Sequence, residues 1–165
     1  PGGAKRRPGT QGRKRIVFLG DPQLPEVAQR LEGYHAALAE AKVPARAELE
    51  LAVPFEVGAA RAAVASLLDR KIDFDAVMGC SDLLAISAMQ VLREHGRDVP
   101  RDVAVVGYDD MPLTNYCDPP LSSVHQPVFE AGVQLVDALL AMLHGQVAAP
   151  RVLPVELVVR RSSQA

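Results

Sequence analysis

Asp109 and Asp110 are adjacent carboxylates that directly follow the apolar run "DVAVVGY". A short, β-rich apolar run of this kind is typical of a buried strand in a parallel sheet. Ligands of open parallel sheets bind outside the carboxyl ends of the strands. We therefore expect the residues that follow the other apolar runs to lie at the same edge of the sheet. These residues are Asp21, Phe55, Cys80, Ser81 and Asp82.

The side chains expected at this edge suit a small hydroxylated ligand. Carboxylates accept hydrogen bonds from sugar hydroxyl groups, and the aromatic face of Phe55 can pack against the apolar face of a sugar ring. Arg30, in the first turns of a predicted helix, can donate hydrogen bonds to ring or hydroxyl oxygens. The residue types therefore indicate a binding site for a small polar molecule.

Each of these residues also has a purely structural interpretation. Ser81 suits the N-cap of the helix that follows it, and the helix dipole favours Asp82 in the first turn. Asp109 and Asp110, which precede Pro112, can form an Asx-type turn. We prefer the binding site because several candidate residues coincide at one edge of the sheet.

Sequence motifs of enzymes are largely missing from the chain. It contains no GxSxG, no GxxxxGK[ST] and no GxGxxG after a strand. Asp82 and Asp109 resemble a paired-carboxylate acid–base site, but no third group indicates which of them would be the acid. The histidines show no metal-ligand spacing. We therefore expect no catalytic residues, no metal and no cofactor, and keep a small α/β hydrolase-type enzyme as the weakest alternative.

Short apolar runs alternate with amphipathic segments over the first two thirds of the chain. Strands are predicted at 15–20, 47–53, 74–79 and 102–108. Helices are predicted at 25–41, 56–70 and 81–96. Strand starts about thirty residues apart are typical of strand–helix units. The alternation therefore predicts an α/β fold, with a parallel sheet and helices on both of its faces.

The last third of the chain breaks this alternation. A loop at Pro119 and Pro120 leads to "LSSVHQP" and then to an amphipathic helix that begins at Val128. The segment "RVLPVELVVR" is expected to form one or two closing strands. The apolar face of the helix contains Phe129, Val133, Val136, Leu140 and Leu143. Nothing in the local sequence indicates which sheet this face would cover.

Charge is distributed unevenly over the 165 residues. Six of the 18 basic residues, and no acidic residue, lie within the first fifteen positions. We expect residues 1–14 to be a disordered basic tail or linker. The rest is acidic, with a balance of about −8, and is a poor match for the phosphates of DNA. Without an apolar signal segment, a membrane-spanning run or a CxxC pair, the chain is expected to be cytoplasmic.

The residues resemble the lactose-repressor/galactose-repressor family of transcription regulators. The resemblance depends on "VPRDVAVVGYDD" followed by "PPLSSVHQP", and it extends from "RIVFLG" to "LPVELVVRRSS". It implies a fold of the type I periplasmic-binding-protein class, in which two lobes close on a small effector. It also implies a homodimer. Residues 15–165 would form the effector-binding domain, mainly its C-terminal lobe plus a crossover helix at about 128–143.

The resemblance assigns roles to individual residues. Arg30 matches the arginine that binds the effector, and Ser81 matches a polar effector contact. Asp109 matches the acid that grips effector hydroxyl groups or ring nitrogens, whereas Asp110 would shape the turn. Phe55 matches the aromatic residue that stacks on the effector, and Gln126 lies at the crossover that lines the cleft.

The resemblance also implies where partners bind. Helix 82–95 and the loop 111–120 would face the second subunit, with Ile86, Met89 and Tyr116 as contacts. DNA would be bound only through a headpiece that is absent from this chain, and the helix at 128–143 would pack on a first lobe that is largely absent too. The function implied is the effector-binding and dimerisation portion of a transcriptional repressor that senses a sugar or nucleoside-like ligand. A transport-type sugar-binding protein of the same fold is the alternative.

Overall fold

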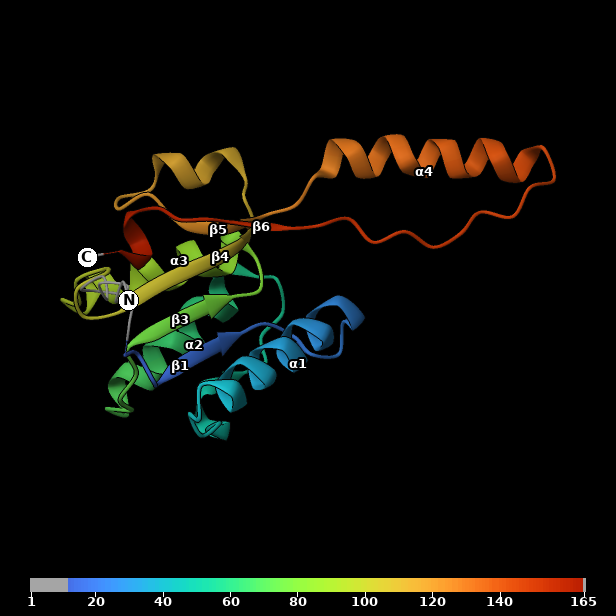
Figure 1. The fold of residues 1–165 in the computed structure, drawn as a ribbon. Coiled ribbons are helices and arrows are strands. Elements are labelled where there is room, and N and C mark those ends of the chain that lie inside the picture. The colour runs from blue at the N-terminus through green and yellow to red at the C-terminus, as the bar shows by residue number, and fades with distance from the viewer. Residues whose placement is uncertain (1–11, 165) are drawn as a thin grey trace, which may run out of the picture.

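The computed structural model describes residues 12–164, so most of the tail predicted to be disordered, residues 1–14, lies outside the described residues. A six-stranded sheet, in the spatial order β2-β1-β3-β4-β5-β6, forms the centre of the molecule (Figure 1). All neighbouring strands are parallel except β5 and β6. The predicted parallel sheet is confirmed. The strands are β1 (Ile16–Leu19), β2 (Glu50–Leu51), β3 (Ala76–Gly79), β4 (Ala104–Asp109), β5 (Ser122–His125) and β6 (Glu156–Val158).

Three helices cover the sheet, with α1 on one face and α2 and α3 together on the other (Figure 1). This arrangement confirms the prediction of helices on both faces. Ser81 caps α3, because its Oγ accepts a hydrogen bond from the amide of Leu84 at 3.3 Å. Gly96, at φ +70°, follows the end of that helix. The helices are α1 (Pro25–Glu40), α2 (Val57–Asp69), α3 (Asp82–Glu94) and α4 (Val128–Leu143).

The strand predicted at 47–53 is shorter in the structure. Ala47–Leu49 form a 3₁₀ helix, and only Glu50–Leu51 pair with β1. This strand lies at the edge of the sheet, where only one side has a partner, and Pro54 ends the segment soon after. Two further 3₁₀ helices, η2 (Pro112–Tyr116) and η3 (Arg161–Ser163), follow β4 and β6.

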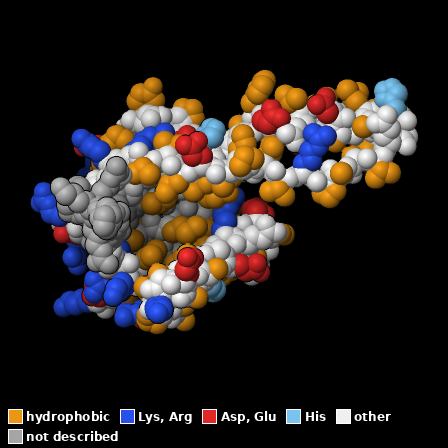
Figure 2. Space-filling view, in the orientation of Figure 1, with side chains coloured by type: hydrophobic (Ala, Val, Ile, Leu, Met, Phe, Trp, Pro, Cys, Tyr) orange, Lys and Arg blue, Asp and Glu red, His pale blue; other side chains and the backbone are white. Residues whose placement is uncertain are grey.

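Helix α4 extends away from the sheet together with the segment that returns to β6 (Figure 1). None of its residues is buried, and Phe129, Leu135 and Leu143 are each more than 70% exposed. Figure 2 shows hydrophobic side chains along its length. The apolar face predicted from the sequence therefore has no sheet to cover within the described residues.

Candidate ligand-binding site

Strand β4 ends at Asp109, beside the end of β5, because Asp109 pairs with His125 in the sheet. Gln126 is the next residue after β5. Its side-chain amide donates a hydrogen bond to Oδ1 of Asp109 at 2.7 Å. Two residues that the sequence placed at the binding edge are thus in direct contact.

Arg30 reaches the same edge from α1. Its guanidinium donates a hydrogen bond to the main-chain oxygen of Cys80 at 2.7 Å and lies 3.8 Å from the centre of the Tyr108 ring. The second contact has the geometry of a cation–π interaction. Arg30 is therefore fixed between the ends of β3 and β4, and the ring that it contacts belongs to the residue before Asp109.

The environment of Asp109 combines opposing effects on its acidity. Burial raises the pKa of the Asp109 carboxyl above its ordinary value, whereas the hydrogen bond from Gln126 and the positive charge of Arg30 act against this rise. The carboxyl is partly buried and keeps one oxygen, Oδ2, outside the contact with Gln126. A carboxylate in this setting can accept hydrogen bonds from a hydroxylated ligand.

Ser81 and Phe55 occupy less specialised positions. Ser81 is only 8% exposed, and its hydroxyl oxygen is used by the cap of α3. Phe55 lies in the loop between β2 and α2 and is 38% exposed. The structure thus brings Arg30, Asp109 and Gln126 together, shows a structural use of Ser81, and leaves Phe55 available on the surface.

Asp110 has no free oxygen atom. Its Oδ1 accepts a hydrogen bond from Arg160 at 2.7 Å, and its Oδ2 is 3.1 Å from Nδ1 of His125. Asp110 therefore ties the turn after β4 to β5 and to the end of the chain, in agreement with its expected role in shaping the turn. The contact with Arg160, which is 50 residues away along the chain, is not predictable from the local sequence.

Tyr108 is the functional candidate that sequence reasoning missed. Its ring lies against the guanidinium of Arg30, whereas the sequence pointed only to its neighbour Asp109. One feature of the sequence could have indicated a role for Tyr108. It is an aromatic residue near the end of a predicted strand, in a chain with only 4% aromatic residues.

Asp82 is completely buried at the start of α3. Its carboxyl accepts hydrogen bonds from the Ser123 hydroxyl at 2.5 Å and from the Met111 amide at 2.7 Å. Burial raises the pKa of Asp82 above its ordinary value, the nearby Asp109 and Asp110 raise it further, and the two hydrogen bonds oppose the rise. Within the described residues this carboxyl does not reach the surface of the site.

Lowering the pH should stabilise the protein through Asp82. Because its folded pKa is raised, folded Asp82 holds its proton at pH values at which the unfolded chain has released it. Over that interval, which starts near the ordinary pKa of about 3.9, stability falls as the pH rises. We expect the unfolding free energy of the unaltered chain, relative to that of Asp82→Asn, to increase from about pH 7 to about pH 4. Urea unfolding at several pH values measures this, and a pH-independent difference would contradict it.

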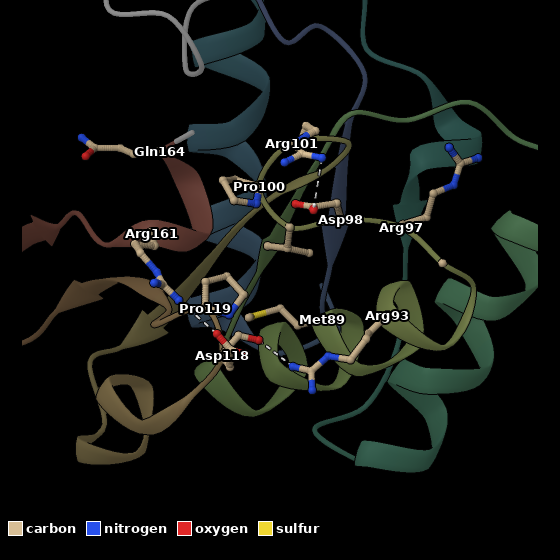
Figure 3. A pocket seen from close by; sticks show the side chains of 12 residues that line it. Met89, Arg93, Arg97, Asp98, Pro100, Arg101, Asp118, Pro119, Arg161 and Gln164 are labelled. Atoms are coloured by element: carbon tan, nitrogen blue, oxygen red, sulfur yellow. Dashed lines mark hydrogen bonds and ion pairs between the residues drawn. The ribbon is translucent and has the colours of Figure 1, made fainter.

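A further cavity lies at the opposite ends of the strands, away from Asp109. It has a volume of about 700 Å³ and lies where α3 ends and the loop before β4 begins. Figure 3 shows Arg93 and Arg161 turned toward Asp118, and Arg101 turned toward Asp98. The two ends of β4, six residues long, are roughly 20 Å apart at about 3.3 Å per residue. The cavity is therefore separate from the edge that holds Asp109.

The residues expected at a subunit interface differ in exposure. Tyr116, in η2, is 86% exposed, and Ile86 is partly buried on α3. Met89 is only 4% exposed and packs in the core. Of the three, Tyr116 offers the most surface to a partner.

Known proteins resemble this chain over most of its length. Residues 10–163 match the family described as "Periplasmic binding protein-like domain". The transcriptional regulator CelR of Thermobifida fusca is 39% identical over 154 residues, which are 92% of this chain and 45% of CelR. The repressor CytR of Escherichia coli K12 is 33% identical over 158 residues, or 94% of this chain and 46% of CytR. The chain thus spans about half the length of these relatives.

Solved structures of regulators also superpose on this chain. A complex of CelR with cellobiose superposes with a TM-score of 0.86 at 39% identity, covering 92% of this chain and 47% of that one. A lac repressor dimer bound to operator and an anti-inducer gives 0.86 at 29% identity, covering 93% and 54%. No helix within residues 12–164 has the length and hydrophobicity needed to span a membrane. By its match over residues 10–163, the chain belongs to the periplasmic binding protein-like family, and it is similar to lactose-repressor-type transcriptional regulators over about half of their length.

Proposed function

We propose that this chain is the effector-binding and dimerisation portion of a DNA-binding transcriptional repressor that senses a small sugar or nucleoside-like molecule. The proposal depends mainly on one observation: Gln126 contacts Asp109 beside the fixed guanidinium of Arg30. These groups lie at the carboxyl edge of a parallel sheet, where ligands of such folds bind. The cellobiose in the CelR complex makes a sugar the first class of ligand to test.

Each group has a distinct part in this proposal. Asp109 accepts hydrogen bonds from ligand hydroxyl groups, and Gln126 holds its carboxyl in one orientation. Arg30 donates to ligand oxygens, and the Tyr108 ring fixes the direction in which its guanidinium points. The exposed ring of Phe55 packs against the ligand from the loop after β2, and Ser81 contributes through the start of α3. No cofactor or metal takes part.

The partners follow from the same proposal. A second copy of the chain would bind α3 and η2, with Ile86 and Tyr116 at the contact and Met89 behind them in the core. DNA would be bound by a headpiece that belongs to another part of the protein, and the setting would be the cytoplasm. A transport-type sugar-binding protein of this fold is the alternative, and an enzyme that uses Asp82 and Asp109 is less favoured because Asp82 is completely buried.

Titration with cellobiose, ribose and adenosine tests the proposal. Binding is followed by the amide signals of the isotope-labelled chain in NMR spectra, because this detects millimolar as well as micromolar affinity. The same samples are assayed for hydrolysis products. We expect saturable binding of at least one compound without turnover. Turnover would support the enzyme alternative, and the absence of binding by all three compounds would count against the proposed effector class.

This chain alone should show no sequence-specific binding to DNA. Outside the basic first fifteen residues it has 12 basic and 20 acidic residues, so its body repels the phosphate backbone. Any binding should come from the basic segment and should disappear as the salt concentration rises, because it depends on counterion release. Gel-shift assays at increasing salt measure this. Salt-resistant binding that prefers one DNA sequence would refute the prediction.

A further inference from the structure

The turn that presents Asp109 has an unusual backbone. Asp109 has φ +108° and Asp110 has φ +53°, so two consecutive residues other than glycine occupy the left-handed half of φ space. Side chains with a Cβ atom rarely adopt such angles, and they persist only where the surrounding structure holds them. The position of the Asp109 carboxyl therefore depends on whatever fixes the main chain of residues 109–111.

Two buried side chains hold this main chain. The Ser123 hydroxyl oxygen accepts a hydrogen bond from the Asp110 amide at 3.0 Å. A carboxylate oxygen of Asp82 accepts one from the Met111 amide at 2.7 Å. The Ser123 hydroxyl also donates to the other oxygen of Asp82 at 2.5 Å, so the two side chains form one unit. We refer to Asp82 and Ser123 together as the turn clamp.

The turn clamp cannot contact a ligand itself. Asp82 and Ser123 are both completely buried. Buried carboxyl groups are costly unless they are hydrogen-bonded, and here both oxygens of Asp82 are bonded. The carboxyl also lies directly against β4, since a Cβ atom added to Gly107 would come within 2.3 Å of its Oδ1. The fit of Asp82 therefore requires glycine at position 107.

We propose that Asp82 and Ser123 are positioning residues of the effector site, which act by holding Asp109 in its binding orientation. The identity of what Asp109 binds rests on the proposed function, whereas the clamping of the turn does not. The chemistry explains why position 82 carries an acid. Both oxygens of Asp82 accept a hydrogen bond, whereas Asn would replace one of these acceptor atoms with a donor NH₂ group.

Ser123→Ala and Ser122→Ala make a matched pair of variants for a test. Ser122 is also completely buried, and its hydroxyl is hydrogen-bonded to the main chain of Arg160, but it does not contact the turn. Both variants lose a buried hydroxyl group, so both should lower the melting temperature. Only Ser123→Ala removes a hydrogen bond to the main chain of the turn, because Ser122 is linked to the turn only through Arg160, whose guanidinium binds the Asp110 side chain.

The first readout is hydrogen exchange at the amides of Asp110 and Met111, which needs no ligand. We expect Ser123→Ala and Asp82→Asn to speed exchange at both amides by about tenfold or more, while Ser122→Ala leaves them unchanged relative to the core. Equal exchange in Ser123→Ala and Ser122→Ala would overturn the turn clamp, whether or not the protein binds a sugar.

The second readout is cellobiose affinity, or that of whichever compound in the panel binds. Ser123→Ala should weaken binding by about tenfold, and in combination with Asp109→Asn it should weaken binding no further than Asp109→Asn alone. Additive losses, or unchanged affinity with a loosened turn, would overturn the positioning role. If no compound binds the unaltered chain, the proposed function fails, and hydrogen exchange alone decides whether the clamp exists.

Discussion

Replacing Asp109 with Asn should weaken sugar binding by roughly ten- to a hundred-fold and leave the melting temperature nearly unchanged. The substitution keeps the shape of the side chain and removes its charge. Asn tolerates the positive φ of this position better than most residues do, and its oxygen can still accept the hydrogen bond from Gln126. The turn should therefore survive, while hydrogen bonds from the ligand lose their charged acceptor.

Asp118→Asn is the matched control for this result. Asp118 is an exposed carboxylate at the opposite ends of the strands, where it pairs with Arg161. NMR titrations give the affinities, and thermal melts give the stabilities. If Asp109 only maintained the turn, Asp109→Asn would leave the affinity as it was. That outcome would remove Asp109 from the site.

The isolated chain should form dimers or larger assemblies, because large exposed apolar patches seldom remain on soluble monomers. The apolar face of α4 includes Phe129, 83% exposed, and Val136, 56% exposed, within described residues that offer it no cover. The double variant Phe129→Glu/Val136→Lys places two charged groups on this face. It should reduce the association that depends on α4.

Gln134→Lys is a suitable control for the association experiment, because it adds a charge to α4 without removing an apolar group. Light scattering gives the mass of each variant. A second contact, through α3 and η2, should persist in the doubly substituted chain as a smaller dimer. A monomeric mass for the unaltered chain would contradict the expected association.

Local sequence patterns predicted most of the sheet and its coverage. The apolar runs that became β1, β3 and β4 are fully embedded between neighbouring strands, so hydrophobicity marks them clearly. The run at 47–53 lies at the sheet edge and forms only a two-residue strand. The segment "LSSVHQP" did not predict β5, because its serines are polar and break the apolar pattern of a buried strand. In the structure these serines are buried, and their hydrogen-bond partners belong to distant segments.

The candidate site was also predictable only in part. The residue types that follow the strands located Asp109 and Arg30, because a parallel sheet brings such positions to one edge. The role of Asp82 was not predictable, since its partners Met111 and Ser123 lie 29 and 41 residues away. Met89 falls on the same helix as Ile86, but the packing of α3 turns it into the core, which helical spacing alone does not distinguish.

The most direct measurement is the map of NMR signals that change when cellobiose, ribose or adenosine is added to the labelled chain. We expect the largest changes at the Asp109 amide, the Gln126 side-chain amide and the Arg30 guanidinium, because these groups meet at the carboxyl edge. The cavity of about 700 Å³ at the opposite ends of the strands is the competing location for a ligand. Saturable changes that are strongest at Arg93 and Arg101, with Asp109 unaffected, would contradict the assignment of the effector site.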